Sequence, residues 1–233
     1  MTRLTPLLFL TASLLARPAA AQLPPPPQYP RLEISVGLTV MSPGPGRGTE
    51  DALTAMGLRG GYAPSMTQCD IQGFWKIEIG TSERRTLGIL KTRVANRTSG
   101  FTEIPGFGHA QVSANHTVVT RAVTWSYRPN GWISVGAGPA LHIRRFAIRG
   151  SGPAVGVQST RSLGAVAGVN LKWKREGVGF AHALWQYRYA GSLTADHVEV
   201  PVHGRTTVPH VKWPSTRIPF SHRMIGIGFG VEF

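Results

Sequence analysis

The last nine residues constrain the fold of this chain more than any other segment. From Ile225 to Phe233, large apolar side chains occupy every second position, with glycine or Glu232 between them. Successive side chains of a β-strand point to opposite faces, so this strand would have one continuous apolar face and one nearly bare face. Such a strand suits a wall with lipid on one side and a narrow, crowded interior on the other. It therefore predicts a barrel that spans a membrane.

The amino terminus has the features of a secretory signal peptide. Met1 to Arg3 is short and basic, Leu4 to Leu15 is mostly apolar, and Ala19 to Ala21 supplies small residues before Gln22. The apolar stretch is too short and too interrupted for a membrane anchor, which needs about 20 apolar residues. A packed N-terminal helix is the alternative. We predict a signal peptide over 1–21, a proline-rich lead-in over 22–30 and one domain over 31–233.

The excess of basic residues raises the question of a nucleic-acid partner. The chain has 25 Lys and Arg against 11 Asp and Glu, a net charge of +14. These charges are scattered singly through alternating segments and form no basic stripe or helix, which nucleic-acid binding would require. We therefore expect no nucleic-acid partner. An anionic lipid surface or a cationic pore lining suits an exported chain better.

Segments with alternating apolar and polar residues predict eight strands. They cover residues 32–41, 70–80, 86–95, 116–127, 132–148, 162–174, 178–190 and the terminal segment. The connections alternate between long loops (42–68, 96–115, 150–160, 191–221) and short turns (81–85, 128–131, 175–177), and Pro43 to Gly46 reads as a breaker. No helical period competes. This predicts an all-β, eight-stranded, antiparallel, up-and-down transmembrane β-barrel with short periplasmic turns and long outer loops.

A secreted β-sandwich is the alternative fold, because it also has short alternating strands. In this chain, however, the second face of several strands is rich in Gly, Ala and Ser, which cover little surface but fit a narrow lumen. Arg121 complicates the pattern, since it shares a face with Val119, Val123 and Trp125. A charge at the lipid midplane costs about 2–4 kcal/mol, so either a bulge resets the phase or Arg121 lies near an interface.

Two sets of residues follow from assigning the large apolar side chains to the lipid. The predicted membrane-interface aromatics are Trp125, Tyr127, Trp132, Trp173, Trp185 and Tyr187. The predicted lumen charge network consists of Glu33, Lys76, Glu78, His142, Arg144, Lys172, Arg188, His222 and Glu232. Eight strands enclose a lumen that side chains can fill, and buried charges should pair across it. We expect a salt-bridged plug; a narrow path lined by Arg, Lys and His would instead favour anions.

Short glycine-rich and aromatic patterns add a family resemblance. Ser134 to Pro139 (SVGAGP) resembles the "VGAGP" strand of the outer-membrane-protein β-barrel superfamily, which includes the OmpA/OmpX-type and opacity-protein-like barrels. Gly164 to Val169 and Gln186 to Tyr189 resemble other strands of that superfamily. The resemblance implies the outer membrane of a Gram-negative-type bacterium, with its lipid and lipopolysaccharide as partners. It also implies that the assembly machinery reads the last strand, with Phe233 as its terminal signal. These patterns specify architecture rather than activity.

No residue set predicts catalysis, a cofactor or a metal. The lipid A deacylases among such barrels carry a His-x-Ser-Asn signature, whereas here Ser221 and His222 are adjacent and would face opposite ways. The loop from Asp196 to His203 lacks the close ligand spacing of zinc sites. The single Cys69 cannot form an internal disulfide. We predict a non-enzymatic barrel with a structural, envelope-stabilising or surface-interaction role through its outer loops. A narrow anion-preferring channel is the alternative, and a lipid A-modifying hydrolase is the third choice.

Overall fold

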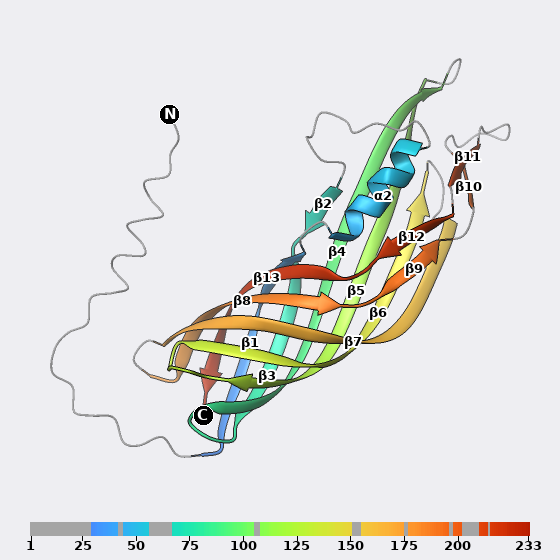
Figure 1. Cartoon of the computed structure of the whole chain (residues 1–233). Helices are drawn as coiled ribbons and strands as arrows, with labels where there is room; N and C mark the ends of the chain where they lie inside the picture. Colours follow the sequence, from blue (N-terminus) through green and yellow to red (C-terminus); the bar gives the residue numbers. More distant parts are fainter. Residues whose placement is uncertain are drawn as a thin grey trace, which may run out of the picture.

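Eight antiparallel strands close into a ring (Figure 1). In chain order they are β1 (Arg31–Met41), β3 (Gln72–Gly80), β4 (Arg85–Ile104), β5 (Gly108–Tyr127), β6 (Ile133–Arg149), β7 (Val155–Lys174), β8 (Gly179–Tyr189) and β13 (His222–Glu232). Each strand pairs with its neighbours in this order, and β13 pairs with β1 to complete the circle. A short strand, β2 (Thr67–Asp70), continues the edge of β3 along β4. The predicted eight-stranded up-and-down barrel is therefore confirmed.

The computed structural model describes most of the chain. The described residues are 29–41, 44–55, 67–104, 108–150, 155–174, 177–195, 198–201, 210–213 and 215–233. The predicted signal peptide and residues 22–28 of the lead-in lie outside them, so those assignments stay predictions. No helix in the described ranges is long and apolar enough to span a membrane.

The two ends of the barrel differ. The chain segments 81–84, 128–132 and 177–178 and Phe233 lie at one end, which we call the turn end. The Asn130 side chain accepts hydrogen bonds from the backbone N–H groups of Trp132 (3.2 Å) and Ile133 (2.8 Å), which fixes the turn that the sequence predicts there. The opposite end, which we call the loop end, carries the paired ends of β4 and β5 at Ile104 and Gly108.

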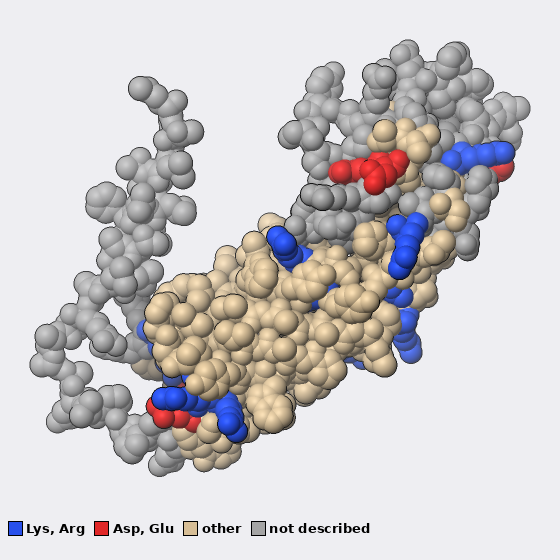
Figure 2. Space-filling view, in the orientation of Figure 1, with Lys and Arg blue, Asp and Glu red and all other residues tan. Residues whose placement is uncertain are grey.

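An alternating burial pattern separates the inner and outer faces of the wall. In β13, Ile225, Ile227 and Phe229 are exposed, whereas Met224 and the intervening glycines face the interior. The same alternation runs around the ring and produces a wide surface with few charges between the two ends (Figure 2). We call this surface the apolar belt; it includes Val36, Leu38, Ile79, Leu87, Ile89, Val123, Trp125, Val135, Leu163, Ile225, Ile227 and Phe229. A belt of this size exposed to water would be unfavourable, so it marks the lipid-facing surface.

A helix at the loop end departs from the prediction. The sequence suggests a breaker at Pro43 to Gly46 and no helix, yet α2 spans Gly44–Ala55. Proline is tolerated in the first turn of a helix, where the backbone N–H has no intrahelical partner, so Pro45 starts the helix rather than preventing it. Ala52 and Leu53 are buried and anchor the helix. Only this short face is apolar, which is why no helical period is visible in the sequence.

Three of the predicted long outer loops, 96–115, 150–160 and 191–221, contain strand residues in the described ranges. Residues 96–104 extend β4 and residues 108–115 extend β5, and the two strands stay paired as far as Ile104 opposite Gly108. The alternation persists there, but buried Asn96 and Thr98 replace apolar residues, so the hydrophobic signal is lost. The region 191–221 contains four short strands that form two ladders. These strands are β9 (Ser192–Ala195), β10 (Val198–Pro201), β11 (His210–Trp213) and β12 (Thr216–Pro219).

A glycine in β6 offers a direct test of how tightly the wall is built. A Cβ atom at position 138 would overlap the backbone carbonyl oxygen of Val123, whereas one at Gly131 in the turn would meet nothing. Overpacking costs about 1–3 kcal/mol, and a backbone atom relaxes less easily than a side chain. We expect Gly138→Ala to lower the free energy of unfolding in urea by at least this amount, with Gly131→Ala unchanged. Equal stability of the two variants would contradict the close β5–β6 approach.

Candidate functional site

Buried charges fill the turn end of the lumen. We call this set the charged plug; it consists of Glu33, Lys76, Glu78, Arg128, Lys172 and Glu232. The register explains how the three carboxylates meet, because Glu33 in β1 stands directly opposite both Glu78 in β3 and Glu232 in β13. Like charges placed opposite each other destabilise a sheet. Cations from elsewhere in the ring must therefore compensate them.

Those cations lie within ion-pair distance. Lys172 Nζ is 2.9 Å from Glu33 Oε1 and 2.7 Å from Glu232 Oε2. Arg128 Nη1 is 2.7 Å from Glu33 Oε1, and Lys76 Nζ is 2.8 Å from Glu78 Oε2. Lys172 comes from β7, three strands away around the ring, so these pairs cross the lumen. The plug is held by attraction among groups that are almost fully removed from water.

Sequence reasoning missed three of the cations. Arg31 and Lys174 each approach a Glu232 oxygen to 2.6 Å, and Arg128 lies in a predicted turn rather than a strand. The available signal was their position at strand ends beside the carboxylates. Burial lowers the pKa of Arg128, but its hydrogen bond and charge attraction to Glu33 outweigh this and raise the pKa above its usual value. Arg128 therefore stays charged.

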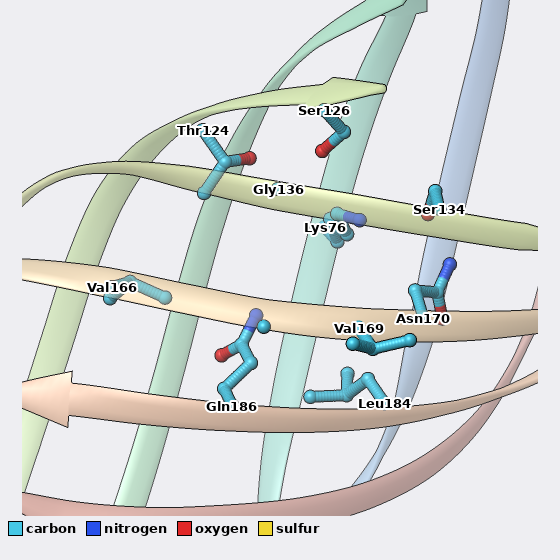
Figure 3. A pocket seen from close by; sticks show the side chains of 11 residues that line it. Lys76, Thr124, Ser126, Ser134, Gly136, Val166, Val169, Asn170, Leu184 and Gln186 are labelled. Carbon is cyan, nitrogen blue, oxygen red and sulfur yellow. The ribbon is translucent and has the colours of Figure 1, made fainter. Parts of the chain in front are cut away.

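Above the plug, buried polar side chains point into the lumen. A cavity of about 20 Å³ lies between Lys76, Ser126, Ser134, Asn170 and Gln186, whose side chains converge from several strands (Figure 3). That volume holds about one water molecule. The cavity therefore suits an ordered water between polar side chains.

Further toward the loop end lies a layer of basic side chains that we call the basic layer: His142, Arg144, Arg188 and His222. Arg188 is completely buried; it donates hydrogen bonds to Thr92 Oγ1 and, over 2.8 Å, to Gln186 Oε1. Arg144 Nη1 donates to the carbonyl oxygens of Ala190 (3.0 Å) and Ser192 (2.7 Å). No carboxylate among the described residues pairs with either guanidinium. The expectation that lumen charges pair across the barrel thus describes the plug, whereas neutral oxygens satisfy the basic layer.

The two histidines of this layer are also bonded on one side only. His142 Nδ1 lies 3.0 Å from Thr120 Oγ1, and His222 Nδ1 lies 2.7 Å from the Phe220 carbonyl oxygen. The Nε2 atoms of both rings are buried and have no hydrogen-bond partner among the described residues. The basic layer therefore has ring nitrogens that could form further hydrogen bonds, and it carries a positive charge that no described carboxylate balances.

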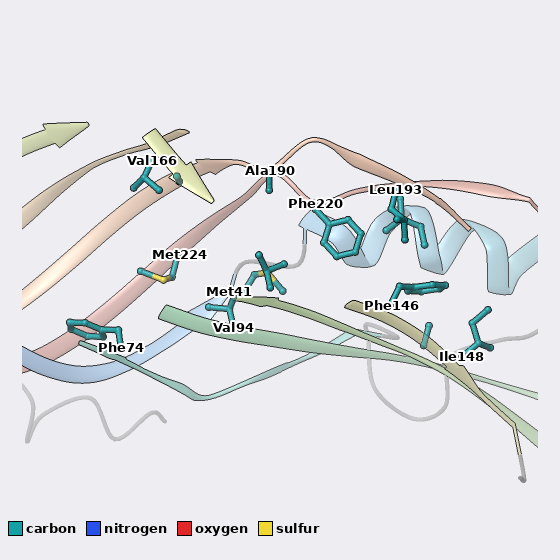
Figure 4. Packing of buried hydrophobic residues seen from close by; sticks show 14 of the residues in the cluster. Met41, Phe74, Val94, Phe146, Ile148, Val166, Ala190, Leu193, Phe220 and Met224 are labelled. Atoms are coloured by element: carbon teal, nitrogen blue, oxygen red, sulfur yellow. The ribbon is translucent and has the colours of Figure 1, made fainter. Parts of the chain in front are cut away.

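An apolar core and α2 close the loop end. Phe146, Leu193 and Phe220 are buried beside the helix (Figure 4). Thr49 of α2 is completely buried, and its Oγ1 lies 2.7 Å from His116 Nε2 of β5. The helix is therefore bonded to the inner wall as well as packed on the core.

The predicted aromatic set and the terminal residue are on the outside. Their members, each exposed by 43% or more, are Trp125, Tyr127, Trp132, Trp173, Trp185, Tyr187 and Phe233. Phe233 exchanges two backbone hydrogen bonds with Leu32, of 3.1 and 2.9 Å, so the last residue is tied to the first strand. An interfacial role for the aromatics and an assembly role for Phe233 stay predictions.

The serine and histidine side chains form no catalytic chain in the described part of the molecule. Ser162 Oγ donates to the Ala190 carbonyl oxygen, His116 contacts Thr49, and Glu78 is paired with Lys76. A Ser/His/acid mechanism needs these groups hydrogen-bonded in sequence. No group of three or more His, Cys, Asp or Glu side chains in the described ranges could hold a metal ion. Residues 196, 197 and 203 of the histidine-containing loop lie outside those ranges.

Comparison with known proteins identifies the fold class. No protein-family model matches the chain, and no curated protein matches it by sequence. Among solved structures, the outer membrane protein OprG from Pseudomonas aeruginosa is similar with a TM-score of 0.50 and 11% identity, over 88% of this chain and 96% of OprG. Ail of Yersinia pestis, solved with the heparin analogue sucrose octasulfate, is similar with a TM-score of 0.44 and 12% identity, over 88% of this chain and all of Ail. The outer membrane protease OmpT from Escherichia coli is similar with a TM-score of 0.42 and 11% identity, over 91% of this chain and 99% of OmpT.

The chain thus has the fold of the outer-membrane β-barrels. The fold that the resemblance of its strand patterns implies is confirmed, and the apolar belt fits the membrane location that the resemblance also implies. At such low identity the likeness defines architecture alone.

Proposed function

We propose that this protein is a non-enzymatic outer-membrane barrel that strengthens the envelope and presents its loop end for surface interactions. The observation that carries the proposal is that buried side chains occupy the lumen at three successive levels among the described residues. The charged plug, the basic layer and the apolar core under α2 follow one another from the turn end to the loop end. A lumen occupied in this way supports a stabilising role rather than transport.

The extended loop end supports the surface role. β4 and β5 each have 20 residues, about twice the 9–11 that a tilted strand needs to cross a bilayer, and therefore project beyond the belt. α2 and the β9–β12 and β10–β11 ladders surround the same end. Interacting groups held on paired strands need less ordering on binding than groups on flexible loops.

Recording from the purified protein in planar lipid bilayers tests the filled lumen. We expect no reproducible current steps above the bare-bilayer baseline at moderate voltages. An outer-membrane channel of known conductance, inserted in the same bilayers, controls for insertion of protein. Reproducible single-channel steps would overturn the structural role.

A narrow anion path is the second candidate, and the basic layer specifically favours it. Arg144 and Arg188 carry charge inside the lumen, and no carboxylate of the described residues pairs with them, so an anion entering there would be attracted by both. If current steps appear, this candidate expects anion selectivity that falls in Arg188→Gln. Cation-selective steps would exclude it.

A further inference from the structure

Three cations stand on the lipid-facing surface of the barrel. Arg121 is exposed and lies directly opposite Lys91 across the β4–β5 ladder, and Arg93 is the next outward residue on β4. The ladder runs through this point without a register shift, so no bulge turns Arg121 inward. The sequence left two explanations for Arg121, and the structure favours a position near an interface.

The three cations mark the loop-side edge of the belt on these strands. Counted from the turn end, the outward residues of β4 are Arg85 at the strand start, then Leu87 and Ile89 of the belt, followed by Lys91. On β5, Trp125 and Val123 come before Arg121. The charges therefore lie on the loop-end side of the belt, which the predicted orientation of the barrel places toward the outside of the cell.

None of the three cations forms an ion pair with a described residue. Lys91 and Arg121 are like charges placed directly opposite each other, an arrangement that destabilises a ladder unless an anion lies between them. The low dielectric constant of the neighbouring lipid increases both their repulsion and the attraction of an added anion. The site is electrostatically incomplete without a negatively charged partner.

An apolar groove lies beside the same cations. It has a volume of about 250 Å³ and is lined on the outer surface by Val36, Gly73, Trp75, Lys91 and Arg93. Gly73 creates it, because the nearest atom to a Cβ at that position would be the Gly37 carbonyl oxygen at 3.9 Å. The groove suits a hydrocarbon chain that extends from a headgroup bound at the cations.

We propose that Lys91, Arg93 and Arg121 bind the phosphates of lipid A, with one acyl chain in the groove at Gly73. Three cations without an ion pair among the described residues favour a ligand with more than one negative charge, and lipid A carries two phosphates whereas phosphatidylglycerol carries one. The proposal deepens the envelope role proposed above, but the two can fail separately. A barrel that conducts ions and still binds lipid A would overturn only the earlier proposal.

Titration of the folded barrel in detergent with lipid A, followed by native mass spectrometry, tests the headgroup site. We expect Lys91→Gln/Arg121→Gln to weaken lipid A binding about tenfold or more, because two charge-assisted contacts are lost. Arg161→Gln/Arg223→Gln removes the same charge from exposed outward positions away from the groove and should change affinity less than about twofold. Equal weakening in the two double variants would overturn the site in favour of general charge attraction.

A groove-filling variant and two further ligands test the position of the acyl chain and the choice of lipid. Gly73→Leu should weaken binding of lipid A but not of its fully deacylated, diphosphorylated disaccharide, which has no chain to place in the groove. Unchanged binding of lipid A to Gly73→Leu would overturn the acyl position. Phosphatidylglycerol vesicles should compete poorly. Competition as strong as that of lipid A, with the same dependence on Lys91 and Arg121, would overturn the choice of lipid.

Discussion

Replacing Lys172 with methionine should lower the free energy of unfolding of the barrel by about 3–5 kcal/mol, the usual effect of removing one partner of a buried ion pair. Lys172 Nζ lies between Glu33 and Glu232, and its side chain is only 5% exposed. Methionine keeps most of the volume but leaves two neighbouring carboxylates with less compensation. The measurement is equilibrium urea unfolding in detergent or lipid vesicles, followed by tryptophan fluorescence.

Lys174 provides a matched control on the same carboxylate. Its Nζ is 2.6 Å from Glu232 Oε2, but its side chain is 43% exposed, so water already screens the pair. Lys174→Met should therefore cost less than about 1 kcal/mol. Adding Glu33→Gln to Lys172→Met should recover part of the loss, because it removes one of the two carboxylates that Lys172 neutralised, while Arg128 keeps Glu78 within 4.0 Å. If both lysine variants lose the same stability, the plug is not a dehydrated network.

The sequence was sufficient to predict the wall of the barrel, because apolar and polar residues alternate with a period of two along its strands. Once the apolar residues of a strand such as β13 are assigned to lipid, the alternation fixes the face of every other residue. Glu33, Glu78 and Glu232 could therefore be placed inside before any contact was known. The sequence could not show that these three carboxylates meet at one level of the barrel, because this depends on the register between β1 and its two partner strands.

The sequence also could not predict which groups the buried cations of the lumen bind. Arg144 is satisfied by carbonyl oxygens at Ala190 and Ser192, which it reaches only because the chain turns inward after β8. Backbone carbonyls are present at every residue, so no side-chain pattern indicates them. Arg121 shows the same limit on the outer face. The alternation left open whether a bulge turns it inward, and the β4–β5 register was needed to decide this and to show that it lies opposite Lys91.

The α2 helix was missed because its stability comes from tertiary contacts. A helix of 12 residues is marginal on its own in water, so packing of its buried face must hold it in place. That face consists of Thr49, Ala52 and Leu53, too few residues to reveal a period. The Thr49–His116 contact then joins two segments 67 residues apart. This dependence makes the helix the part of the loop end that should detach first.

Replacing Leu53 with aspartate should detach α2 while leaving the ring intact. Loss of a buried leucine costs about 2–5 kcal/mol, and a charge in its place costs more. Local opening should therefore increase at least about thirtyfold, measured as the rate of tryptic cleavage after Arg47 with the fragments identified by mass spectrometry. The matched control is Thr54→Asp, which adds the same charge at the next, exposed position and should leave the rate within about threefold.

The same variant separates the contributions of the helix and the plug to lumen closure. The backbone pairing of the eight strands does not involve Leu53, so heat-modifiable gel migration should persist. Because the charged plug and basic layer still fill the lumen, Leu53→Asp should produce no current steps in planar bilayers. Steps that appear in this variant and not in Thr54→Asp would mean that α2 alone closes the barrel. In that case the side chains below the helix would line a path, and Arg188 would become its main anion-attracting group.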